Sequence, residues 1–136
     1  MVIPETVFDM IARHEGFSPV PYRCTAGKLT VGYGHNLDEP MSKEEARALL
    51  EVRLRNTIRD LLYVLPDLWN YGEKRASAFI DMAFNLGVPK FRGFKNMIAA
   101  AKRGEWELVA QEAEYSNWYG QVGNRGKEVV KLLREG

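Results

Sequence analysis

The sequence predicts a mainly helical α+β fold with a small amino-terminal lobe and a larger lobe made only of helices. The stretch His14–His35 combines glycine turns with alternating strand character, whereas apolar residues elsewhere recur at helical spacing. A long amphipathic segment at 42–64 separates the two patterns. We therefore expect one domain, 1–136, with a small lobe at about 1–40, a linking helix at about 42–64 and a helical lobe at about 65–136.

Composition and charge exclude several classes of protein. The net charge of +1 argues against binding of nucleic acid by bulk electrostatics. No apolar run approaches the roughly 20 residues of a membrane span, and the first residues lack the pattern of a signal peptide. One cysteine excludes an internal disulfide, and two histidines at unrelated spacings make a metal site unexpected. We expect a monomer without cofactor, metal or membrane insertion.

The first predicted helix runs from about Pro4 to Glu15. Its apolar stripe consists of Val7, Phe8, Ile11 and Ala12. Glu15 falls on this core-facing stripe in the last turn, and Gly16 ends the helix behind it. The negative end of the helix dipole and partial burial should both raise the pKa of Glu15. A carboxylic acid that is neutral near physiological pH is suited to general-acid catalysis.

A β-hairpin follows this helix. Cys24 closes its first strand, and Thr30 lies in its second. Only a loop with an odd number of residues places these two side chains on the same face of the hairpin. We predict the odd loop, with Gly27 at positive φ. Gly32 and Gly34 share the face of Thr30 and should leave open space beside it, as an extended ligand would require.

The remaining helices are predicted at 42–64, 73–86, 94–102 and 105–115. Ser42 and Glu45 form a capping box that begins the long helix, and Pro66 stops it. The faces expected in the core contain Ala76, Phe79, Ile80, Ala83, Met97, Ile98, Ala101, Trp106, Val109, Ala110 and Ala113. A cleft between the two lobes is the expected place for a ligand.

The spacing of three residues resembles a known catalytic signature. Glu15, Cys24 and Thr30 are separated by eight and five residues, and Val-Gly-Tyr-Gly-His follows. This pattern resembles the phage lysozymes of glycoside hydrolase family 24, the T-even type of endolysin, whose middle position is Asp or sometimes Cys. The resemblance implies that Glu15 is the general acid and that Thr30 helps to hold the attacking water. It covers nearly the whole chain, since 79–87, 116–119 and 124–125 also correspond.

The resemblance also implies residues that contact substrate. Phe84 and Asn85 would lie at the mouth of the cleft, where an aromatic edge and an amide can meet a sugar. Packing in the core and capping of the helix are the alternative roles of these two residues. Asn117 and Gln121 complete the expected substrate-binding set.

Two further residues have expected supporting roles. The resemblance implies that Arg125 approaches Glu15, and an ion pair between them would oppose the raised pKa of the acid. His35 is expected to be a hydrogen-bonded structural histidine that holds the hairpin to the lobe, and the resemblance implies that it pairs with an acid of the following helix. Arg53 stands in that acid's place, which leaves Glu51 as a doubtful substitute.

The role of Cys24 remains open at this point. A lone cysteine is generally a small buried apolar residue, but the spacing to Glu15 and Thr30 favours a catalytic role. Its thiolate can attack the sugar as a nucleophile, or its sulfur can orient a water as a weak acceptor. The pKa of the thiol decides between them, and the family favours the water-holding role.

The predicted function is that of a muramidase that cleaves the bond between N-acetylmuramic acid and N-acetylglucosamine in the glycan strands of peptidoglycan. A lytic transglycosylase and a peptidoglycan-binding module without activity are the alternatives. The resemblance implies a phage endolysin that stays in the host cytoplasm until it is released to the wall. Between Lys74 and Arg103, seven cations face a single acid. This segment is either a solvated helical face or a surface that attracts an anionic wall polymer.

Overall fold

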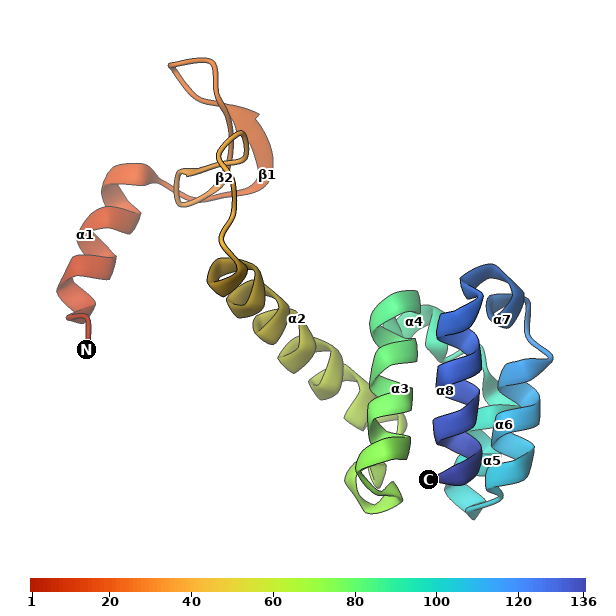
Figure 1. Ribbon diagram of the computed structural model, residues 1–136. Helices are drawn as coiled ribbons and strands as arrows, with labels where there is room; N and C mark the ends of the chain where they lie inside the picture. Colours follow the sequence, from red (N-terminus) through yellow and green to blue (C-terminus); the bar gives the residue numbers. More distant parts are fainter. The chain divides into compact units, whose positions relative to one another are not determined.

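The computed structural model describes residues 1–136 and divides them into two compact units, Met1–Ala46 and Arg47–Gly136. The first unit holds one helix and the whole sheet, and the second is all helical (Figure 1). The predicted α+β class is therefore confirmed. A single domain with a cleft between its lobes stays a prediction, and the units are described separately.

The first unit contains α1 (Glu5–Glu15) and three strands, β1 (Ser18–Arg23), β2 (Leu29–Gly32) and β3 (His35–Asn36). The strands form an antiparallel sheet in the order β1-β2-β3. The sequence predicts only the hairpin, and the two-residue third strand was not expected. Because β2 is central, Thr30 lies between Tyr22 on one side and Asn36 on the other.

The turn between β1 and β2 has the predicted odd loop. The N–H of Cys24 donates to the carbonyl of Lys28 at 2.9 Å, and the N–H of Gly27 donates to the carbonyl of Cys24 at 2.8 Å. Gly27 has a φ of 79°, as predicted. A closed loop of residues 25–27 therefore places Cys24 and Thr30 on the same face of the hairpin.

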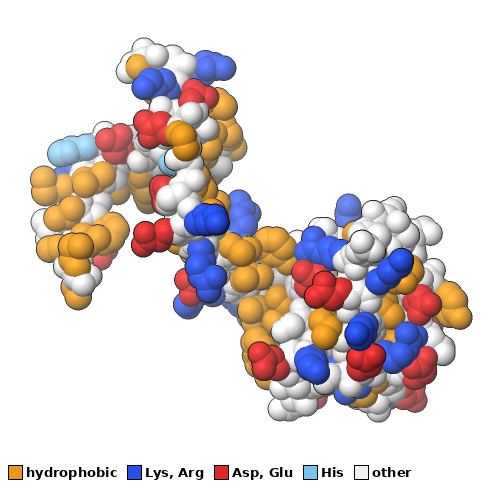
Figure 2. Space-filling model, in the orientation of Figure 1, with side chains coloured by type: hydrophobic (Ala, Val, Ile, Leu, Met, Phe, Trp, Pro, Cys, Tyr) orange, Lys and Arg blue, Asp and Glu red, His pale blue; other side chains and the backbone are white.

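Helix α1 ends where the sequence predicts. Gly16 has a φ of 74° and donates its N–H to the carbonyl of Ala12 at 2.9 Å. The expectation of a core-facing stripe is not met within this unit, because α1 has no buried residue. Hydrophobic side chains gather on the surface of this helix (Figure 2).

Helix α2 (Lys43–Val64) begins in the first unit and continues into the second. Its predicted capping box is confirmed, since Ser42 N–H donates to Oε1 of Glu45 at 3.0 Å and Glu45 N–H donates to Oγ of Ser42 at 3.1 Å. Leu61 is its single buried residue.

The second unit adds a short 3-10 helix η1 (Leu68–Tyr71) and six α-helices. They are α3 (Glu73–Leu86), α4 (Val88–Phe91), α5 (Lys95–Arg103), α6 (Trp106–Glu114), α7 (Asn117–Val122) and α8 (Asn124–Glu135). The predicted helices agree with α3, α5 and α6 to within one residue at each end. Helix α8 packs between α3 and α6 (Figure 1).

The core of the second unit is built on aromatic and aliphatic side chains of these helices. Every residue predicted for the core of this unit is buried except Ile80 and Trp106, which are half-buried. The guanidinium of Arg75 lies over the ring of the half-buried Trp106, at 4.4 Å from the ring centroid. Phe79 is fully buried and packs edge-on against Phe91.

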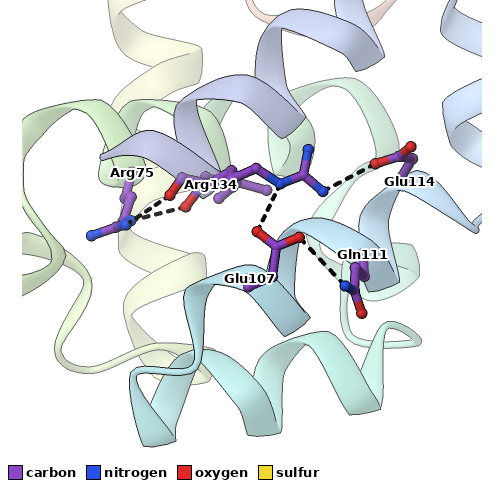
Figure 3. Close-up of polar contacts among 6 residues, drawn as sticks. Arg75, Glu107, Gln111, Glu114 and Arg134 are labelled. Carbon is purple, nitrogen blue, oxygen red and sulfur yellow. Dashed lines mark hydrogen bonds and ion pairs between the residues drawn. The ribbon is translucent and has the colours of Figure 1, made fainter.

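Polar contacts fasten α8 to its neighbours (Figure 3). Nε of Arg75 donates to the carbonyl of Leu133 at 2.9 Å, so an α3 side chain satisfies the open end of α8. Nε of Arg134 pairs with Glu107 at 2.9 Å, and its Nη2 pairs with Glu114 at 3.2 Å. No helix of either unit is long and apolar enough to cross a bilayer.

Candidate active site

Glu15 lies at the end of α1, with its side chain against the backbone of Gly34. A Cβ atom at Gly34 would stand 2.5 Å from Oε2 of Glu15 and 3.1 Å from its Cδ. The absence of that atom makes room for the carboxyl group. The open space expected at Gly34 is therefore filled by Glu15, whereas the space at Gly32 is open as predicted.

The predicted partial burial of Glu15 is not seen in this unit, where the residue is exposed. It ends an exposed helix, so its surroundings are the backbone at Gly34 and solvent.

Cys24 is half-buried at the hairpin turn. The N–H groups of Lys28 and then Ala26 lower the pKa of the thiol below its ordinary value of 9.0. Burial opposes them, and the hydroxyl of Thr30 adds to the lowering. Hydrogen bonds to the charged form stabilise the thiolate, so the turn favours a negative charge at this position.

Thr30 is 4% exposed in the central strand, and its Oγ1 donates to the carbonyl of Lys28 at 2.9 Å. A hydroxyl has one hydrogen and two lone pairs. Thr30 can give that hydrogen to Lys28 or to an ionised Cys24, but not to both at once. In either case a lone pair of its oxygen can accept a hydrogen bond from a water.

His35 is half-buried on β3, and its pairing with an acid of the following helix stays a prediction. The pKa of Glu45 is lowered, chiefly by the N–H and hydroxyl of Ser42 and to a smaller degree by the charge of His35. Glu51 instead pairs with Arg55 at 3.0 Å, one turn along α2.

In the second unit, Asn85 is held by Trp118. The indole Nε1–H donates to Oδ1 of Asn85 at 2.9 Å. Because an indole N–H can only donate, this bond fixes which way the amide points and leaves the NH₂ group to donate outward. Asn85 is exposed and Phe84 beside it is 37% exposed, so both are accessible to a ligand.

Arg125 has a partner within its own unit. Its Nε contacts Oδ2 of Asp81 at 2.9 Å, and its Nη2 contacts Oδ1 at 3.0 Å. This paired hydrogen bonding raises the pKa of Arg125. The predicted ion pair between Arg125 and Glu15 would join the two units, and it stays a prediction.

Asn117 and Gln121 are both exposed on α7. The hydroxyl of Ser116 caps this helix by accepting the N–H of Tyr119. Each unit thus carries part of the predicted set. The first holds the motif residues with His35, and the second holds Arg125 and the four expected sugar contacts. No group of three or more His, Cys, Asp or Glu side chains is placed to hold a metal ion.

Sequence reasoning missed three supporting residues, namely Gly34 as the neighbour of Glu15, Trp118 as the partner of Asn85, and Asp81 as the partner of Arg125. The last two contacts join residues 33 and 44 positions apart. Asp81 had one available signal, since it is the single acid within a cationic segment.

Comparison with known proteins gives a family match over most of the chain. The model of the phage lysozyme family matches residues 12–135. The chain is 22% identical to "Probable T4-type lysozyme 2" of Dictyostelium discoideum, covering 94% of this chain and 93% of that protein. It is 26% identical to an endolysin of Acyrthosiphon pisum secondary endosymbiont phage 1, covering 87% of this chain and 80% of that protein.

A third relative is much longer than this chain. It is the pre-baseplate central spike protein Gp5 of Enterobacteria phage T4, with 27% identity over 94% of this chain. The match covers only 27% of the spike protein, so the chain corresponds to about a quarter of it.

Proposed function

This chain belongs to the phage lysozyme family, and on that premise we propose that it is an endolysin-type muramidase. Its reaction is hydrolysis of the β-1,4 bond between N-acetylmuramic acid and N-acetylglucosamine in peptidoglycan, which leads to lysis of the host cell. The proposal includes release of the protein from the host cytoplasm to the wall, and action as a monomer.

The local arrangement of the three motif residues is the observation that supports this proposal best. Glu15 rests on a glycine that leaves room for a carboxyl group, at the end of a helix. Cys24 and Thr30 share one face of the hairpin, and backbone N–H groups stabilise the thiolate. Glycoside hydrolysis requires a general acid and a second group that is negatively charged, and these correspond to Glu15 on the helix and Cys24 on the hairpin.

In the proposed reaction, Glu15 gives its proton to the glycosidic oxygen as the bond to the sugar breaks. The thiolate of Cys24 and a lone pair of Thr30 accept hydrogen bonds from a water, which attacks the anomeric carbon from the opposite face. The proton of the water passes to the thiolate of Cys24, and the product carries the inverted configuration. Covalent capture of the sugar by Cys24 is the alternative, and it would retain the configuration.

Residues of the second unit complete the proposal. Phe84 offers an aromatic edge to a sugar ring, and the outward NH₂ of Asn85 can donate to a sugar oxygen. Asn117 and Gln121 are exposed amides that can act in the same way. His35 supports the hairpin, and Arg125 is proposed to reach toward Glu15.

Mass analysis of digested peptidoglycan tests the reaction itself. Hydrolysis adds one water at each cut, so reducing-end sugars are expected. Anhydro products without added water would establish a transglycosylase, which the lack of a second carboxylate among the motif residues makes the principal rival. Binding to peptidoglycan with no product of either kind would indicate a binding module instead.

Substitution of the acid tests its role. Glu15→Gln is expected to abolish turnover with no change in the circular dichroism spectrum, because an amide cannot donate the proton as an acid does. Lysis by this variant at close to the wild-type rate would refute the assignment.

The role of Cys24 has its own test. Cys24→Asp should stay active if the position only holds water, and NMR of fresh product should show inversion. A trapped glycosyl thioether, or a product of retained configuration, would show that Cys24 is a nucleophile.

A further inference from the structure

Three cations on the surface of the second unit line a hollow of about 460 Å³ that no acid lines. They are Arg92, after α4, with Lys95 and Lys102 on α5. All three are exposed, and none of them forms an ion pair. The single acid of this cationic segment, Asp81, is already bound to Arg125. The positive charge of the hollow is therefore not neutralised by the protein.

An exposed aromatic side chain completes this hollow. Tyr63, at the end of α2, is 77% exposed and forms part of its wall, while Ile98 contributes an apolar surface. An aromatic ring beside cations gives no advantage in binding a free inorganic anion, because the ring makes no favourable contact with it. It suits a ligand that has both a ring with apolar faces and an anionic substituent.

A second hollow shares Lys95 with the first. It is about 640 Å³ in volume and is lined by Lys90 and Lys95, together with Tyr115, which is 83% exposed. One acid, Glu112, also lines it. Lys95 is common to both hollows, and each has an exposed tyrosine of its own. The same combination of ring and cation thus occurs twice along one surface, as a repeating polymer requires.

We propose that these two hollows form a binding surface for a phosphodiester-linked saccharide polymer of the cell wall. Sugar units stack on Tyr63 and Tyr115, and phosphate groups pair with Arg92, Lys95 and Lys102. The choice of a wall polymer rests on the proposed function, since it places the enzyme beside its substrate. The surface lies outside the motif residues, so it adds affinity for the wall and takes no part in the cut.

Cosedimentation with walls tests this inference. The probe is Gram-positive wall material that retains its phosphodiester-linked polymer, compared with the same material stripped by hydrofluoric acid. All proteins carry Glu15→Gln so that the walls stay intact during the measurement. We expect about tenfold weaker binding to stripped walls, and binding to intact walls that weakens steeply with salt.

Charge-matched variants separate this surface from bulk electrostatics. The combined R92Q, K95Q and K102Q variant should bind intact walls about tenfold more weakly. A control with K74Q, K127Q and K131Q removes the same three charges from other exposed positions, and it should change binding less than about twofold. Tyr63→Ala should weaken binding severalfold while keeping the same dependence on salt.

Three results would overturn the inference. They are equal binding to intact and stripped walls, an equal loss in both triple variants, and stronger binding to phosphatidylglycerol vesicles that the R92Q, K95Q and K102Q changes abolish. The last would assign the surface to a membrane. The cutting of short, polymer-free peptidoglycan fragments, measured with Glu15 in place, should be the same for both triple variants. Failure of that cutting in every protein would refute the proposed function without bearing on wall binding.

Discussion

Gly34→Ala should inactivate the protein while leaving it folded. The new Cβ would lie 2.5 Å from Oε2 of Glu15, whereas ordinary contacts begin at 3.4 Å. The carboxyl group must therefore move by about 1 Å, and because it ends a flexible side chain it can do so by rotation. A misplacement of about 1 Å in a reacting group reduces rate on the order of 100-fold. We expect a fall of that size in kcat.

The stability of the same variant should fall much less. Gly34 has a φ of 83°, and a residue with a Cβ atom loses on the order of 1 kcal/mol in such a conformation. For a chain of this length that corresponds to a decrease of about 4 °C in Tm. The expected signature is thus a large loss of activity with a small loss of stability, measured by turbidity clearing and thermal unfolding.

Gly104→Ala provides the matched control. Gly104 has a φ of 73° in the second unit, and a Cβ atom there would meet nothing within 4 Å. It should lose a similar amount of stability with no loss of kcat. If Gly34→Ala keeps its activity within about threefold, or if the control loses as much activity, the contact with Glu15 does not position the acid.

Three further results are expected. The pH at which iodoacetamide alkylates Cys24 at half its maximal rate should lie below 9.0 in the folded protein and at about 9.0 in urea. Between these two pKa values the unfolded chain keeps the thiol proton that the folded chain has lost, so the free energy of unfolding should rise with pH. Trp118→Phe removes the donor to Asn85, which should cost about 1 kcal/mol in urea unfolding. Asp81→Asn should cost less than about 1 kcal/mol, because its ion pair with Arg125 is partly exposed; a larger loss would contradict this reasoning.

The sequence was sufficient to predict those elements that are determined by residues close together in the chain. The capping box of Ser42 and Glu45 joins residues three apart, and the hairpin turn depends on Gly27 within a short loop. Both were predicted and both are confirmed. The ends of α3 were also correct, because Gly72 and Gly87 bound it with positive φ.

The errors have identifiable causes. Helix α8 was not predicted, although Val129, Val130 and Leu133 have helical spacing and are buried. That signal was present in the sequence and was not used. The two residues of β3 form too short a run to show any period. The stripe of α1 predicts a buried face, but no periodicity indicates which surface covers it.

The candidate site divides in the same way. The motif residues were found from their spacing and from the family resemblance, and their roles stay predictions. Their supports were not found, because each is a contact that depends on the fold. Glu15 rests on a glycine 19 positions later, and Asn85 is oriented by Trp118, 33 positions away. The chemical type of each candidate side chain is evident from the sequence, whereas its orientation depends on these distant contacts.

The turn around Cys24 bears on how a thiol can stand where the family more often has a carboxylate. The N–H groups that lower its pKa belong to the backbone of Lys28 and Ala26, so they do not depend on the side chain at position 24. They would stabilise a carboxylate by the same bonds. Nucleophilicity falls as the pKa of a thiol falls, which disfavours covalent attack, while the fraction of thiolate at a given pH rises. A thiolate that accepts a hydrogen bond from a water needs its negative charge but not its nucleophilicity. We therefore keep the water-holding role as the proposal, and the configuration of fresh product distinguishes it from covalent attack.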